Sequence, residues 1–169
     1  GWTDPTPIMD PLRPNLFAFE LTSIHTEVQK VVIVFMLDEH RQLSRFKILL
    51  DQILFVQPKG TVSVADVGCG YGAMLHFIRA NRAYDRLLYS GYDINPTLIK
   101  ACKNDARLPS KRFHVGDRPL TAIDFSVMSG TYNMAVTSDV KNWEEYFLGC
   151  LRSCWRYSRK GMVFKEEAT

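Results

Sequence analysis

Three glycines at alternate positions follow an apolar run near the middle of the chain. Residues 61–67 are rich in valine, and Gly68, Gly70 and Gly72 come directly after them. Glycine adopts positive φ and has no Cβ that would keep a ligand away from the backbone. The helix that we expect at residues 73–83 adds free backbone N–H groups at its start. This pattern predicts a loop that binds a nucleotide-type cofactor, although its G-x-G-x-G spacing differs from the G-x-G-x-x-G of dinucleotide-binding folds.

Two aspartates accompany this loop. Asp66 lies near the end of the apolar run, where burying a carboxylate is costly unless it is hydrogen-bonded. We therefore expect Asp66 to anchor the loop or to meet a cationic ligand. Asp93 ends the next predicted strand, 21 residues after Gly72, where a carboxylate can accept hydrogen bonds from both hydroxyls of a ribose. A turn or helix-capping role ahead of Asn95 is the alternative for Asp93.

Alternating strands and helices position these residues. Strands are predicted at residues 61–67, 87–92, 113–115, 125–129 and 161–165, and helices at 38–57, 73–83, from Pro96 onward and at 142–158. This alternation, with apolar strands, indicates an α/β protein whose parallel sheet is covered on both faces. The ligand crevice of such a sheet lies at the carboxyl ends of its strands, where the glycines and both aspartates fall. Residues 1–15 are predicted to form an irregular arm, and residues 31–36 are strongly β-prone.

Length and composition indicate one globular domain overall. The chain has 169 residues, 46% of them hydrophobic, and a formal net charge of +3, which demands neither a nucleic-acid nor a membrane partner. We assign residues 1–37 to an N-terminal arm with the β-prone segment, and residues 38–169 to the cofactor-binding domain. The longest apolar run has seven residues, far fewer than the ~20 that cross a bilayer.

The four cysteines and four histidines show no metal-ligand spacing. The cysteines form no C-x-x-C pair and the histidines are scattered, so no metal site is predicted. The N-terminus lacks a basic region followed by an apolar stretch and a small-residue cleavage site. Reduced thiols in a cytoplasmic protein are therefore the expectation.

The segments that carry the cofactor prediction resemble a known family. Residues 66–72 (DVGCGYG) resemble motif I of the class I S-adenosylmethionine-dependent methyltransferases, and residues 92–96 (YDINP) are similar to their acidic second motif. Residues 113–117 (FHVGD) match the place where the family commonly has an acidic residue near the adenine amino group. Residues 124–133, which end in SGTYN, resemble a bacterial subgroup with an SG-x-[FY]-N signature.

The resemblance covers about residues 38–165 and includes a helix led by Trp143. It implies a Rossmann-like doubly wound parallel sheet with strand order 3-2-1-4-5. It also implies S-adenosylmethionine as cofactor and S-adenosylhomocysteine as product. The cofactor contacts that it implies are Asp66, Gly68, Cys69, Gly70, Tyr71, Gly72, Asp93, Ile94, Asp117, Arg118, Ser129, Gly130 and Arg45. For Arg45, an ion pair with a surface aspartate is the alternative to a contact with the cofactor carboxylate. The positive sulfonium and α-amino group of this cofactor suit nearby carboxylates, whereas a pyrophosphate prefers positive dipoles.

The implied reaction is methyl transfer to an oxygen or nitrogen atom of a small-molecule acceptor. This is an in-line displacement on an activated carbon, so the protein mainly positions the reactants and needs a base only if the acceptor loses a proton. Candidates for that base are Tyr132, Asn133 and His40, with His76 as a fourth. The alternative is an S-adenosylmethionine-binding module with weak or no catalysis that acts with a partner or as a homodimer. A nicotinamide-dependent oxidoreductase is disfavoured by the glycine spacing and by Asp66.

In the family, the fold continues after the last parallel strand with a helix and an antiparallel pair of strands. This chain ends at Thr169, which predicts that both are missing and that residues 161–165 lie at an exposed sheet edge. A trimmed chain, a naturally shortened protein and a homodimer paired through this edge are the three explanations. We expect residues 31–36, or a partner chain, to shield the edge.

Overall fold

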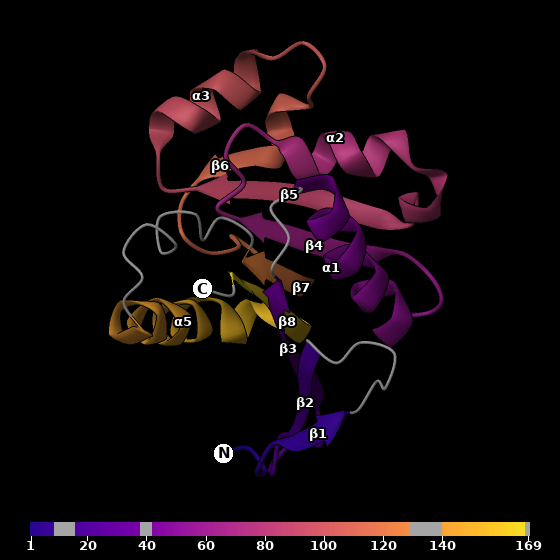
Figure 1. Ribbon diagram of the computed structural model, residues 1–169, viewed down its shortest axis with the longest axis vertical. Helices are drawn as coiled ribbons and strands as arrows, with labels where there is room; N and C mark the ends of the chain where they lie inside the picture. Colours follow the sequence, from indigo (N-terminus) through magenta and orange to yellow (C-terminus); the bar gives the residue numbers. More distant parts are fainter. Residues whose placement is uncertain (9–15, 38–41, 129–139, 168–169) are drawn as a thin grey trace.

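Eight strands of the described residues form one mixed sheet (Figure 1). The computed structural model describes residues 1–8, 16–37, 42–128 and 140–167. The strands are β1 (Thr6–Ile8), β2 (Leu16–Thr22), β3 (Gln29–Leu37), β4 (Val62–Val67), β5 (Leu87–Asp93), β6 (Phe113–Val115), β7 (Ile123–Met128) and β8 (Ser158–Glu167). The helices are α1 (Gln42–Val56), α2 (Ala73–Ala80), α3 (Pro96–Asn104) and α5 (Val140–Cys154), with short 3-10 turns η1 (Arg82–Tyr84), η2 (Ser110–Arg112) and η3 (Trp155–Tyr157). No helix in these ranges has the length and apolar character of a membrane span.

The strands follow the order β1-β2-β3-β8-β7-β4-β5-β6 across the sheet. Strands β3, β8, β7, β4, β5 and β6 are parallel neighbours, whereas β1 with β2 and β2 with β3 are antiparallel. The order of the whole sheet differs from the predicted 3-2-1-4-5 because three N-terminal strands extend it beyond β8. The parallel arrangement brings the carboxyl ends of β4, β5 and β6 to one edge, where the predicted crevice residues lie.

Strand β3 covers the edge of β8 that the sequence predicted to need shielding. The two strands pair in parallel from Val31↔Gly161 to Leu37↔Glu167. A Cβ on Gly161 would overlap the carbonyl oxygen of Val31, so the close approach of the strands requires glycine at this position. The expectation that the β-prone segment shields the last strand is therefore confirmed.

Part of the predicted irregular arm is a strand. Residues Thr6–Ile8 pair with β2, and Trp2 forms an isolated bridge with Ser23. The prediction was wrong because it took the prolines as breakers. Pro7 has no N–H, but β1 is the outermost strand of the sheet, which is where proline is tolerated. The remainder of this predicted arm, residues 9–15, lies outside the described residues.

Helices cover both faces of the parallel strands. One core cluster joins buried residues of α1, α2 and α3 to the sheet, and a second joins Cys154 of α5 to the opposite face. Successive residues of β8 divide between the two clusters, with Val163 in the first and Met162 and Phe164 in the second. The strands are therefore apolar on both faces, which is why they appear as continuous apolar runs in the sequence.

Candidate functional site

The predicted glycine loop connects β4 to α2 at the carboxyl edge of the sheet. Gly68, Gly70 and Gly72 have φ of 83°, 56° and 82°, in the left-handed region that favours glycine. A Cβ on Gly72 would also lie 3.1 Å from the side chains of Leu108 and Phe113. The loop therefore needs glycine for its backbone shape and, at position 72, for its packing as well.

Four backbone N–H groups of the loop have acceptors within the protein. The acceptors are the Tyr92 carbonyl oxygen for Gly68 (2.7 Å) and Cys69 (3.0 Å), Asp93 Oδ2 for Gly70 (3.0 Å), and the Cys69 carbonyl oxygen for Gly72 (3.0 Å). A phosphate-binding loop instead directs such N–H groups at its ligand. The N–H groups that donate to Tyr92 and Asp93 tie this loop to the end of β5, so they are not free to cradle a phosphate.

Asp93 links the glycine loop to the start of α3. Its buried carboxylate accepts from the Gly70 N–H through Oδ2 at 3.0 Å and from the Asn95 N–H through Oδ1 at 2.9 Å. Asn95 in turn caps α3, because its side-chain oxygen accepts from the Thr97 N–H at 2.9 Å. The turn role considered for Asp93 is therefore confirmed, and the ribose contact stays a prediction.

Asp66 lies beneath the loop and is only 1% exposed. The Tyr89 hydroxyl of β5 donates to Asp66 Oδ2 at 2.7 Å, which confirms that this carboxylate is hydrogen-bonded. Burial and the neighbouring Asp66 raise the pKa of Tyr89 well above its ordinary value of 10, so the hydroxyl keeps its proton and remains a donor. Tyr89 was missed in the sequence because its contact with Asp66 depends on the register of β4 with β5, which pairs Tyr89 with Val64 and Gly91 with Asp66.

Two thiols support the middle of the loop. Cys69 Sγ lies 3.7 Å and Cys102 Sγ of α3 lies 3.2 Å from the Gly70 carbonyl oxygen. Burial raises the pKa of both thiols, and Asp66 and Asp93 raise them further. Both thiols are therefore protonated donors at neutral pH rather than reactive thiolates. The sequence offered no signal for Cys102, which is 32 residues from the loop oxygen that it contacts.

Large apolar side chains are exposed around the loop. Tyr71 in the loop is 70% exposed, Ile94 after β5 is 75% exposed and Val115 at the end of β6 is 54% exposed. Each of these residues follows or ends one of the three neighbouring strands β4, β5 and β6, so the side chains lie, like Asp93, at the carboxyl ends of these strands. Apolar surface beside a few placed polar groups is typical of small-molecule sites.

The predicted contacts Asp117 and Arg118 are exposed and packed toward α5 and η3. The Asp117 carbonyl oxygen accepts from the Cys154 thiol at 3.6 Å. The Arg118 guanidinium lies 5.6 Å from the ring centroid of Tyr157, within the range of a cation–π contact. These contacts anchor the segment after β6, while cofactor contacts by the two side chains stay predictions.

Two other predicted residues are on the helices. Arg45 is half-buried in the first turn of α1, and His76 Nε2 of α2 is 4.0 Å from Asp105 Oδ2. The remaining candidates lie outside the described residues: His40, Ser129, Gly130, Tyr132 and Asn133. Within the ranges that are described, no cluster of three or more His, Cys, Asp or Glu side chains is arranged to hold a metal ion.

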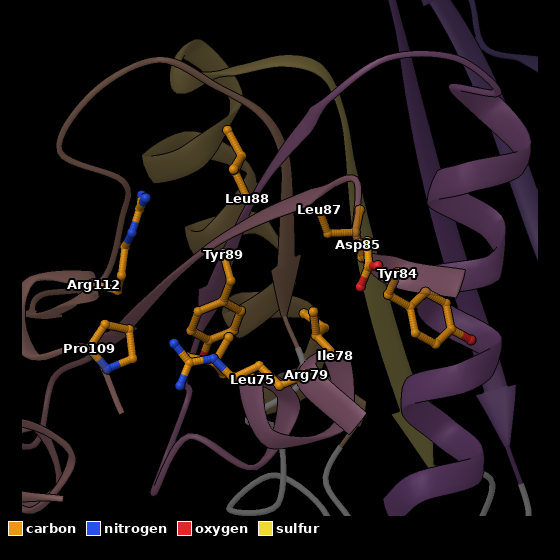
Figure 2. Close-up of a pocket in the computed structure, with 10 residues that line it drawn as sticks. All are labelled: Leu75, Ile78, Arg79, Tyr84, Asp85, Leu87, Leu88, Tyr89, Pro109 and Arg112. Atoms are coloured by element: carbon orange, nitrogen blue, oxygen red, sulfur yellow. The ribbon is translucent and has the colours of Figure 1, made fainter. Parts of the chain in front are cut away.

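A hollow of about 240 Å³ borders the Tyr89 ring near the start of β5 (Figure 2). It is lined by Leu75, Ile78, Arg79, Tyr84, Asp85, Leu87, Leu88, Tyr89, Pro109 and Arg112. Strand β6 pairs with β5 only at residues 91–93, so the hollow borders the first half of β5. The glycine loop follows the opposite, carboxyl ends of these strands, and the hollow is therefore not the predicted crevice.

No protein-family model matches the chain. The chain is 31% identical over 104 residues to a Mycobacterium tuberculosis protein named "Putative methyltransferase Rv1506c", an alignment that covers 60% of this chain and 61% of that protein. A second comparison matches the solved structure of CalS10 with bound SAM, described as an amino pentose methyltransferase of Micromonospora echinaspora involved in calicheamicin biosynthesis. The two structures superpose with a TM-score of 0.41 and 22% identity, over 53% of this chain and 37% of that chain. The chain thus spans less than two thirds of the length of either protein, and its sequence is similar to part of one named as a methyltransferase.

Proposed function

We propose that the chain binds S-adenosylmethionine at the glycine loop and belongs to an enzyme that transfers its methyl group. The observation that carries this proposal is the orientation of the loop's own hydrogen bonds. The N–H groups of Gly68, Cys69 and Gly70 point to protein acceptors, and two buried carboxylates, Asp66 and Asp93, lie beside the loop. An anionic pyrophosphate would find these three donors already engaged and two carboxylates beside them.

A cationic nucleoside suits this arrangement better. The sulfonium and α-amino group of S-adenosylmethionine are positive, and a buried carboxylate such as Asp66 attracts positive charge more strongly than it would in bulk water. The exposed side chains of Tyr71 and Ile94 offer apolar surface for a flat base. The sequence similarity to a protein named as a methyltransferase supports the same cofactor class over a nicotinamide nucleotide.

The proposed acceptor is a small molecule that is methylated on oxygen or nitrogen. Positioning supplies most of the rate in such a displacement, and a base is needed only for an acceptor that must lose a proton. Tyr132, Asn133 and His40 are the residues that we propose to test as that base. S-adenosylhomocysteine is the product that leaves the loop.

Calorimetric titration with S-adenosylhomocysteine and, separately, with NAD tests the cofactor. We expect binding of the first and none of the second, and the reverse result would refute the proposal. Asp93→Asn is the site variant, and Asp124→Asn is its matched control, because Asp124 is a buried strand aspartate that accepts from the Ser63 N–H at 3.0 Å away from the loop. Turnover of the methyl donor with a panel of hydroxyl- and amine-bearing metabolites then tests catalysis, and binding without turnover would favour a non-catalytic module.

A further inference from the structure

The Tyr89 hydroxyl of β5 donates to Asp66 of β4, two residues before the glycine loop begins at Gly68. We propose that Tyr89 is a positioning residue that holds the Asp66 carboxylate ionised and fixed beneath the loop, so that its charge faces the bound cofactor. This inference rests on the proposed function for the identity of the ligand. The hold of Tyr89 on Asp66 is a property of the ligand-free protein and is tested separately.

The packing around Tyr89 holds its hydroxyl against the Asp66 carboxylate. Tyr89 is 4% exposed, and its ring centroid lies 5.9 Å from that of the fully buried Phe113, at an interplanar angle of 56°. A Cβ on Gly91 would lie 2.9 Å from the Tyr89 hydroxyl and 2.9 Å from the Phe113 ring. Because Gly91 pairs with Asp66 across the two strands, the missing side chain at position 91 makes room for the hydroxyl at the carboxylate.

The titratable groups that face Asp66 come from three elements. Tyr89 extends from β5, Cys69 from the glycine loop and Cys102 from α3, and Asp93 lies beyond the loop at the end of β5. The phenol and both thiols are neutral, because burial raises the pKa of each. The Tyr89 hydroxyl, at 2.7 Å, is a short hydrogen-bond donor to the carboxylate. A hydrogen bond to the charged form favours ionisation and offsets the cost of burial.

The structure contains a matched control for this hydrogen bond. Tyr84 lines the same hollow as Tyr89 (Figure 2), and its hydroxyl also donates to an aspartate, Asp51 Oδ1 of α1, at 2.8 Å. Burial and Asp51 raise the pKa of Tyr84 as well. Tyr84→Phe and Tyr89→Phe therefore each remove a phenol hydroxyl that donates to an aspartate, and only the second removes it from the loop aspartate.

The affinity for S-adenosylhomocysteine is measured by calorimetry from pH 6 to pH 8.5 for both variants. Tyr89→Phe is expected to raise the Kd about tenfold at pH 6, the order of a lost hydrogen bond to a charged group, and by less than about threefold at pH 8.5. The dependence on pH follows because, without the hydrogen bond from Tyr89, Asp66 stays protonated up to a higher pH. A further rise in pH then removes this proton and restores the charge of Asp66. Tyr84→Phe is expected to match the unmodified protein at every pH. A loss of affinity that is equal at all pH values would overturn the positioning role.

Carbon-13 NMR of the Asp66 carboxyl in the ligand-free protein separates this inference from the proposed function. The protonation midpoint of Asp66 should move to higher pH in Tyr89→Phe and remain in place in Tyr84→Phe. Incorporating 3-fluorotyrosine at position 89, which keeps the ring and makes a stronger donor, should move it to lower pH. If the unmodified protein binds no S-adenosylhomocysteine, the proposed cofactor is wrong, and this titration still decides the role of Tyr89. An unchanged midpoint in both position-89 variants would refute the inference.

Discussion

Replacing Gly72 by alanine separates two reasons for a glycine at the start of α2. The left-handed φ of 82° costs any other residue about 1–2 kcal/mol. The new Cβ would also lie 3.1 Å from the side chains of Leu108 and Phe113, and both are buried. Forcing a methyl group into a packed core adds about 1–3 kcal/mol. Gly72→Ala should therefore lower the free energy of unfolding by about 2–5 kcal/mol, as measured by urea denaturation.

Two other glycines are matched controls for this prediction. Gly60, after α1, has φ of 80° and nothing within 4 Å of an added Cβ, so Gly60→Ala should show the backbone cost alone and leave cofactor binding unchanged. Gly70 has φ of 56° and the same open space, but that space lies at the proposed site. Gly70→Ala should match Gly60→Ala in stability and weaken S-adenosylhomocysteine binding. Equal destabilisation by Gly72→Ala and Gly60→Ala would refute the packing argument.

The remaining predictions concern charged groups. Asp93→Ala should weaken S-adenosylhomocysteine binding, measured by calorimetry, by about 1–3 kcal/mol, because the Gly70 and Asn95 N–H groups lose their acceptor. Unchanged affinity would contradict a role of Asp93 at the site. Burial lowers the pKa of Lys30 from 10.5, so at this group the unfolded chain binds more protons just below pH 10.5. The contribution of Lys30 to stability should therefore rise with pH there, whereas the buried tyrosines and thiols, whose pKa is raised, contribute a fall. In urea denaturation at high pH, the stability of the unmodified protein should therefore rise relative to that of Lys30→Met, and a constant difference between the two would refute the assignment to Lys30.

The sequence alone determined the elements of the parallel sheet and the loop that follows its central strand. Apolar runs that are separated by amphipathic segments predict buried parallel strands, because both faces of such strands are covered. Gly68, Gly70 and Gly72 were recognisable because only glycine adopts left-handed φ without cost. Asp66 and Asp93 were recognisable because a carboxylate at the end of an apolar strand needs a partner.

The tertiary structure decided which groups those residues meet. The sequence led us to expect that residues 31–36 shield residues 161–165, but local periodicity does not specify the register of a strand. The parallel register of β3 on β8 and the place of β1 at the sheet edge therefore came only from the structure. The hydrogen bond from Tyr89 to Asp66 joins residues 23 apart, and it exists because β4 and β5 align with Gly91 opposite the carboxylate. The loop's inward-turned N–H groups, which disfavour a phosphate ligand, likewise depend on where β5 ends. Residue types thus predicted the glycine loop and its aspartates, and strand register determined the hydrogen bonds that these residues make.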